Sequence, residues 1–140
     1  MKIDAGAVVC IDAELSGEVS VGDGCVIHPR ASLIGAAGPL VLGTGNIVEE
    51  RALIATAEDR TLKIGNNNVF EVGCRVESIS IGDANIVEAR AILGAGTVIG
   101  NGCCIGAGVV IPPGTVVPDH TVIWGSNREQ RRIEESMEVS

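Results

Sequence analysis

The sequence predicts an all-β fold, a parallel β-helix in which short strands wind into a stack of triangular coils. Three observations predict it: an apolar residue recurs every six positions, the breaks in this period fall at one corner, and the residues between are small or turn-forming. The recurring residues are aliphatic except for Phe70. A repeat of this kind buries its apolar side only by stacking on a neighbour. The hexapeptide period therefore decides the fold class.

The breaks in the period indicate that three hexads make one coil. The interval between apolar positions changes to nine, ten and five residues on reaching Leu42, Ile64 and Ile81 respectively. All three breaks follow a third hexad, whereas two hexads per coil would scatter them over different corners. The sequence thus predicts a triangular prism of about seven coils, roughly 30 Å long at the usual strand spacing. Its three inward stacks are expected to be Ile3, Val21, Leu42, Ile64, Ile81, Ile99 and Val117; then Val9, Ile27, Val48, Phe70, Val87, Ile105 and Ile123; then Leu15, Leu33, Ile54, Val76, Leu93 and Ile111.

The residues between the apolar positions predict tight corners. Four positions after most apolar residues stands a small or turn-forming side chain, because a corner has no room for a large inward group. Glycine often follows the apolar residue directly, as at Gly22, Gly65 and Gly100, and is expected to supply the backbone freedom that a turn needs. The aromatic content of 1% agrees with a thin interior filled by aliphatic side chains.

Two segments interrupt the coils, and a third follows them. Residues 35–41 are predicted to form a short apolar corner, and residues 55–63 a polar loop. A capping-box pattern that begins at Ser126 predicts a short charged α-helix to about Met137.

The composition is that of one acidic domain. A formal net charge of −8 and a pI near 4.6 argue against nucleic acid or an anionic membrane as a partner. The chain enters the first coil almost at once, and no apolar run is long enough to span a bilayer, so a cytoplasmic protein is the default expectation. The expected organisation is a β-helix over residues 1–125, followed by a helix and tail over residues 126–140.

The five cysteines are interpreted as packing residues. Cys25, Cys74 and Cys103 occupy the small-residue position of their hexads, where cysteine behaves as a small apolar side chain. The sequence has no CxxC motif. Neither a disulfide framework nor a metal cluster is therefore expected.

The hexapeptide prism, with N-I-V-E at residues 46–49 and V-I-W-G at residues 122–125, resembles the gamma-class carbonic anhydrase branch of hexapeptide-repeat proteins. The resemblance implies a left-handed β-helix. Members of that branch hold zinc with three histidines, and the corresponding positions here are Ile54, Glu71 and Val76. Two aliphatic side chains and one carboxylate cannot supply the three ligands that zinc needs. We therefore expect the fold without a metal, a cofactor or a catalytic residue.

Longer segments are similar to the dynactin subunit 6 family within that branch. The similarity extends from Lys2 to about Gly125, and N-N-V-F-E-V-G-C at residues 67–74 is its most specific part. The resemblance implies a non-catalytic structural and interaction subunit of the pointed-end complex of dynactin, the cofactor of cytoplasmic dynein. It further implies a cytoskeleton-associated location, pairing with a second β-helical subunit, and a part in attaching cargo or adaptors.

Two histidines keep an enzymatic alternative open. Acyltransferases built on a hexapeptide prism use one histidine as a general base in a groove between subunits. His28 belongs to the second coil and His120 to the seventh, so the two cannot act together within one chain. The alternatives are therefore a gamma-carbonic-anhydrase-like enzyme or acyltransferase that uses one such histidine, and two solvated corner histidines without a catalytic role.

Charged columns mark a predicted partner surface. Glu49, Glu71 and Glu88 each follow a residue of the second stack, and Arg51 and Arg90 lie two positions further on. Stacking would bring the glutamates within about 5–10 Å of each other, a repulsion that the arginines can offset. A self-neutralising ladder on the surface would explain this pattern, and so would a face whose alternating charge orients a partner. These five residues are the interface candidates, together with the first coils, whose outer edge is predicted to be uncovered.

Overall fold

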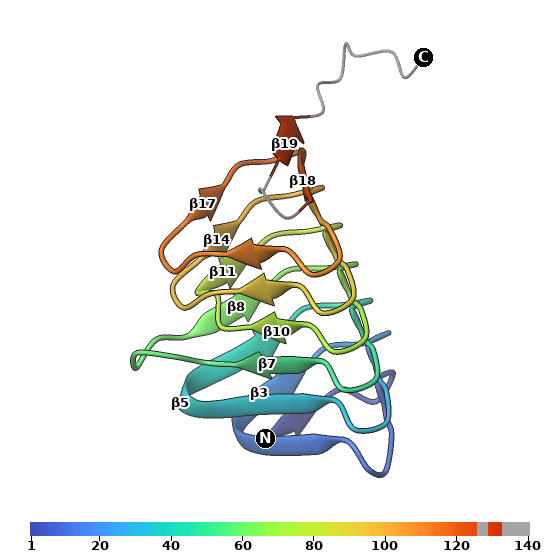
Figure 1. Cartoon of the computed structure of the whole chain (residues 1–140). Coiled ribbons are helices and arrows are strands. Elements are labelled where there is room, and N and C mark those ends of the chain that lie inside the picture. The colour runs from blue at the N-terminus through green and yellow to red at the C-terminus, as the bar shows by residue number, and fades with distance from the viewer. Residues whose placement is uncertain (126–128, 133–140) are drawn as a thin grey trace.

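Most hexads form one short strand, two longer strands span two hexads each, and three hexads make one coil of a triangular prism (Figure 1). The computed structural model describes residues 1–125 and Glu129–Arg132. The strands nearest the viewer in Figure 1 run from right to left while the coils rise from the N-terminal end, so the helix is left-handed. The predicted left-handed parallel β-helix is confirmed. No helix in the described part of the chain has the length and apolar character needed to cross a membrane.

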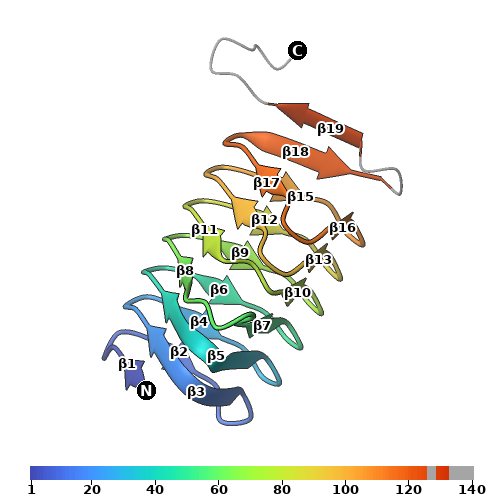
Figure 2. The same cartoon turned by 90° about the vertical axis from the view of Figure 1, so that its left-hand side faces the viewer.

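The prism has three faces, which we number in chain order (Figure 2). The first face contains β1 (Lys2–Ile3), the later parts of β3 (Glu14–Val21) and β5 (Ser32–Leu42), β8 (Leu62–Ile64), β11 (Ser80–Ile81), β14 (Val98–Ile99) and β17 (Val116–Val117). The second contains β2 (Val8–Val9), β4 (Val26–Ile27), β6 (Ile47–Val48), β9 (Val69–Phe70), β12 (Ile86–Val87), β15 (Cys104–Ile105) and β18 (Thr121–Trp124). The third contains the earlier parts of β3 and β5, β7 (Leu53–Ala55), β10 (Arg75–Val76), β13 (Ile92–Leu93) and β16 (Val110–Ile111).

The strand register confirms all three predicted inward stacks. Val87, for example, pairs with Phe70 in the coil below and with Ile105 in the coil above. From the second coil onward the stacked residues are almost completely buried and form one continuous core. The period of six therefore specified the register, because a slip of one residue would turn each apolar side chain outward.

A buried ladder of asparagines lies beside the second stack. Asn46, Asn68 and Asn85 occupy the small-residue position in successive coils, and each is 0% exposed. The side-chain amide of Asn68 donates to Asn46 Oδ1 at 3.0 Å and to the Gly82 carbonyl at 2.9 Å, while Asn68 Oδ1 accepts from the backbone and side chain of Asn85. Among the described residues, no buried side-chain polar atom lacks a partner. The ladder thus satisfies polar groups inside the corner and joins neighbouring coils.

The glycines that directly follow the stack residues have a different role from the one predicted. The left-handed backbone conformation occurs two positions later in the hexad, as at Gly24 and Gly45, with φ of 74° and 67°. At Gly65 an added Cβ would instead lie 2.7 Å from the carbonyl oxygen of Gly82 in the next coil. Glycine is therefore required there by the close approach of two coils, and not by the turn.

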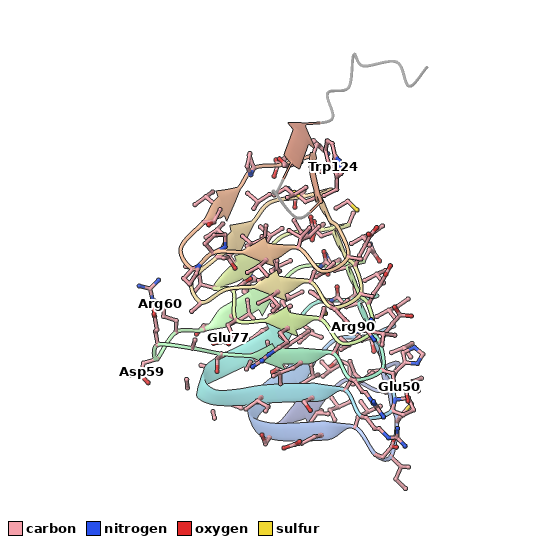
Figure 3. All side chains as sticks on the ribbon, in the orientation of Figure 1. Glu50, Asp59, Arg60, Glu77, Arg90 and Trp124 are labelled. Atoms are coloured by element: carbon pink, nitrogen blue, oxygen red, sulfur yellow. The ribbon has the colours of Figure 1, made fainter. Side chains whose placement is uncertain are left out.

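Residues 35–41 do not form the predicted corner loop. They belong to β5, which continues round the corner and pairs with β3 on one side and with β7 and β8 on the other. Gly35 pairs with β3, Leu40 and Val41 pair with both β3 and β8, and at the corner between them the amides of Ala37 and Gly38 donate to the Thr56 hydroxyl. As a result the first and third faces form a single sheet, whereas the second face is separate. Residues 55–63 do contain a loop, between β7 and β8, from which Asp59 and Arg60 project (Figure 3).

The predicted C-terminal helix is wrong at Glu129–Arg132, which form strand β19. This strand pairs antiparallel with β18, the last strand of the second face. β18 pairs with β15 on its inner side, and without β19 the backbone groups on its outer edge would have no neighbouring strand. The remaining parts of the predicted helix and tail, residues 126–128 and 133–140, lie outside the described residues.

Candidate functional site

The second face has a continuous column of outward, partly exposed apolar residues, which we call the apolar stripe. Its outward residues stand one position before the inward stack, and consecutive members are paired by strand register. The outward columns of the other faces contain charges, such as Lys63 on the first face and Arg75 on the third. The members of the apolar stripe are Val8, Val26, Ile47, Val69, Ile86, Cys104 and Val122.

An acidic column borders this stripe. Glu49, Glu71 and Glu88 directly follow inward residues of three successive coils on the second face, and all three are half-buried. The backbone amide of Glu49 donates to Phe70 O, and that of Glu71 to Val87 O, so these positions are held in register. Carboxylates one coil apart are separated by only about 5 Å of coil spacing. The structure thus brings the three predicted glutamates into one column.

The arginine column lies at the adjacent corner in a strained conformation. Arg30, Arg51 and Arg90 have positive φ of 61°, 62° and 60°. Other coils have Gly73 and Gly108 at this position. A side chain with Cβ in this left-handed region costs on the order of 1 kcal/mol relative to glycine.

The expected neutralisation of the acidic column is not seen as direct ion pairs. Among the side chains of residues 1–125, the basic and acidic groups that approach within 4.0 Å are Arg30 and Glu50. The two side chains are 59% and 50% exposed, so this pair contributes little to stability. Figure 3 shows Glu50 and Arg90 along the same edge of the prism. The sequence did not indicate Glu50 as a surface candidate, because it stands one position outside the periodic acidic column.

Glu88 is held in place by its neighbours in the next coil. Its Oε1 accepts a hydrogen bond from the Ala107 backbone amide at 3.1 Å, and its Oε2 lies 3.5 Å from Cys104 Sγ. Burial, and then the nearby Glu88 carboxylate, raise the pKa of the Cys104 thiol to about 11. Burial likewise raises the pKa of Cys74 to about 12, and the charges of Glu71 and Glu49 add to this effect. Both cysteines are therefore protonated near neutral pH and are not activated nucleophiles.

The comparisons with solved structures concern the fold. A family model described as bacterial transferase hexapeptide (six repeats) matches residues 78–113. A hexapeptide transferase family protein from Anaplasma phagocytophilum is similar with a TM-score of 0.86 and 20% identity, over 96% of this chain and 80% of that chain. A putative acetyltransferase from Bacillus cereus is similar with a TM-score of 0.59 and 18% identity, over 96% of this chain and 78% of that chain. At such identities the likeness establishes the fold alone.

Curated relatives are more similar in sequence. Dynactin subunit 6 of Danio rerio is 43% identical over 106 residues, which cover 67% of this chain and 54% of that protein. Dynactin subunit 6 of Nematostella vectensis is 43% identical over 108 residues, covering 69% and 59%. In Caenorhabditis elegans the identity is 34% over 97 residues, covering 69% and 54%.

The chain is a relative of dynactin subunit 6. The resemblance expected from the sequence is thereby confirmed over about two thirds of this chain. The chain spans about half the length of the curated relatives that it matches.

In this relative of dynactin subunit 6, the positions that correspond to zinc ligands do not converge on a site. Ile54 and Val76 pair with each other in the inward third stack and are completely buried. Glu71 lies on the outer side of the second face. Among the described residues there is no group of three or more histidine, cysteine, aspartate or glutamate side chains arranged to hold a metal ion.

The two histidines lie at opposite ends of this dynactin subunit 6 relative. His28 follows β4 in the second coil, and His120 precedes β18 in the seventh, so about 24 Å of stacked coils separate them. His120 has a positive φ of 57° and its amide donates to Asn101 O, which places it in a corner turn. In residues 1–125, no carboxylate oxygen lies within 4.0 Å of either imidazole to orient it as a general base.

The two ends of the prism differ in how they are covered. At the C-terminal end β19 pairs with β18, and Ile123 is only 4% exposed. At the N-terminal end Ile3 is 44% exposed although it belongs to the inward stack, and Leu15 is only partly buried. The first coil thus presents apolar side chains and the unpaired edges of β1 and β2 to solvent.

Proposed function

We propose that this chain is a non-catalytic structural and interaction subunit of the dynactin pointed-end complex. It works in the cytoplasm in association with the cytoskeleton and supports dynein-dependent transport. The observation that carries the proposal is its identity of 34–43% to dynactin subunit 6 over about two thirds of this chain. The protein pairs with another β-helical subunit and helps to attach cargo or adaptors, without binding nucleic acid or inserting into a membrane.

The surface that supports this pairing has two parts. The open first coil, where Ile3 is 44% exposed, offers strand edges that another β-helix can continue. The charged edge formed by Glu49, Arg51, Glu71, Glu88 and Arg90 adds an electrostatic pattern that sets the orientation of the partner.

Affinity purification tests the proposed function directly. Tagged chain added to a cell extract is expected to co-purify with dynactin components, identified by mass spectrometry. A tagged hexapeptide acyltransferase of similar size serves as the control for non-specific binding to the prism. Purification that repeatedly yields no dynactin component above this control would contradict the proposal.

Charge reversal on the second face is expected to weaken the association without unfolding the prism. In a variant that combines Glu49→Lys, Glu71→Lys and Glu88→Lys, we expect recovery of dynactin components at physiological salt to fall at least about tenfold. The melting temperature should change by only a few degrees, because partly exposed surface charges contribute little to stability and the hydrogen bond lost from the Ala107 amide to Glu88 lies at the surface. Quantitative mass spectrometry and circular dichroism measure the two effects.

The matched control makes the same change in net charge on other parts of the prism. It combines Glu58→Lys, Asp59→Lys and Glu77→Lys, which lie in the loop between β7 and β8 and beside the third face, away from the first coil. Recovery should stay near that of the unmodified chain. If both triple variants behave alike, the acidic column is a solvated ladder and another surface binds the partner.

An enzymatic function is the alternative, and the likeness to hexapeptide transferases is the observation that favours it. Metal analysis and carbonic anhydrase assays of the purified chain discriminate between the two, as does a search for acyl-coenzyme A bound between the subunits of a homotrimer. Stoichiometric zinc with bicarbonate-forming activity, or such a liganded trimer, would replace the proposed function.

A further inference from the structure

The apolar stripe on the second face extends over every coil and is partly exposed, most at Val8 and Ile86, while its other members are partly buried. Val8 is 55% exposed and Ile86 is 40% exposed. In the equivalent column of the first face Lys2 and Lys63 interrupt the apolar residues. A continuous exposed apolar surface bordered by charges is typical of a binding site for another protein.

The charges beside the stripe indicate what the partner must carry. The acidic column of Glu49, Glu71 and Glu88 has no basic side chain within 4.0 Å among residues 1–125. If a partner segment covers the stripe, the side chains along one of its edges lie over these carboxylates. Lysines or arginines on that edge would be attracted to these carboxylates, whereas a second copy of this chain, which also has a net charge of −8, would be repelled overall.

The spacing of the stripe favours an α-helix over a β-strand. Neighbouring stripe residues are one coil apart, about 4.8 Å, and an α-helix places one residue per turn of about 5.4 Å on a given side. An extended strand places residues on one side about 6.8 Å apart and would lose register sooner. The stripe, about 29 Å long over six spacings, would accommodate a helix of roughly 20 residues along the prism axis.

We propose that the second face is a docking site for an amphipathic α-helix of a partner protein. The helix lies along the prism axis, with its apolar residues on the stripe and lysines or arginines over the acidic column. This inference rests on the proposed function in taking the second face as a partner surface, and it specifies the element that the partner presents there.

A synthetic peptide can test this without knowledge of the partner. The probe is a fluorescent 20-residue helix-forming peptide with leucines at i, i+3 and i+7 spacing and lysines along one flank. One control peptide has the same composition in scrambled order, and another has glutamate in place of lysine. By fluorescence anisotropy with the full chain, the probe should bind at least about tenfold more tightly than either control.

Two neighbouring isoleucines supply a matched pair of variants. Ile86 and Ile92 occupy the same position of successive hexads, on the second and third faces, and are 40% and 37% exposed. Ile86→Ser should weaken binding of the probe about fivefold through lost apolar contact, while Ile92→Ser should leave it unchanged. Glu71→Gln should weaken binding about threefold and reduce its salt dependence, and Glu77→Gln on the third face should not.

Three results would overturn the inference. The first is binding of the scrambled peptide as tight as that of the probe. The second is an equal loss of binding in Ile92→Ser and Ile86→Ser. The third is a homodimer of the chain that Ile86→Ser dissociates, which would assign the face to a second copy. Dynactin recovery is measured separately with the unmodified chain. Normal recovery together with absent probe binding would reject the helix alone, whereas specific probe binding without dynactin recovery would reject only the proposed function.

Discussion

Ile105→Asp is expected to unfold the C-terminal coils. Ile105 is completely buried and lies in register between Val87 and Ile123. The substitution places a carboxylate in an apolar stack with no partner, at a cost of at least about 4 kcal/mol. Coils of a solenoid contact only their neighbours, so the damage should be concentrated around β15 and β18. Hydrogen exchange followed by mass spectrometry should show lost protection there, together with a lower melting temperature.

Val116→Asp is the control for this prediction. Val116 is 66% exposed on β17 of the first face, so an aspartate there remains hydrated. The variant should melt within a few degrees of the unmodified chain. An Ile105→Asp variant with unchanged melting and unchanged exchange would show that Ile105 does not face the core.

Phe70→Ala is expected to lower the free energy of unfolding by about 3–5 kcal/mol. Phe70 is completely buried, and its neighbours in the second stack, Val48 and Val87, are much smaller. They cannot fill the space that the ring leaves, because they belong to strands held by hydrogen bonds between coils. Urea unfolding followed by circular dichroism measures the loss.

Phe70→Leu separates the cavity from the loss of an aromatic ring. Leucine restores most of the volume with the side-chain type that occupies many other stack positions, so its cost should be below about 1.5 kcal/mol. Equal destabilisation by alanine and leucine would argue that a specific aromatic contact, and not packing volume, holds this position.

The sequence was sufficient to predict the stacks and the acidic column because both follow from the period. Once three hexads make one coil, the neighbours of Ile105 or of Glu71 are obtained by counting along the chain. The apolar stripe could have been found in the same way, since Val8, Ile47 and Ile86 precede stack residues at regular intervals. The period alone did not reveal the stripe, because its residues stand directly before the inward residues and look like part of the same apolar core.

The corrections concern contacts that a period does not specify. The sequence interpretation assigned Gly65 to the turn, but its φ is not in the left-handed region and the carbonyl of Gly82 is what excludes a side chain there. The sequence likewise did not predict the hydrogen bonds of Asn68 to other coils, because an asparagine at a corner is equally typical of a simple turn. In both cases the deciding atom belongs to another coil.

The sequence by itself determined the solenoid, its three faces and the side chains that each face presents, since alternation and the six-residue repeat are local properties of the chain. Only the tertiary structure decided how the ends and corners are completed. The extended path of β5 and the antiparallel strand β19 both depend on unpaired backbone groups in a neighbouring coil. Those groups become available only after the coils have stacked, and for this reason the helix expected from the pattern at Ser126 is replaced by a strand at Glu129–Arg132.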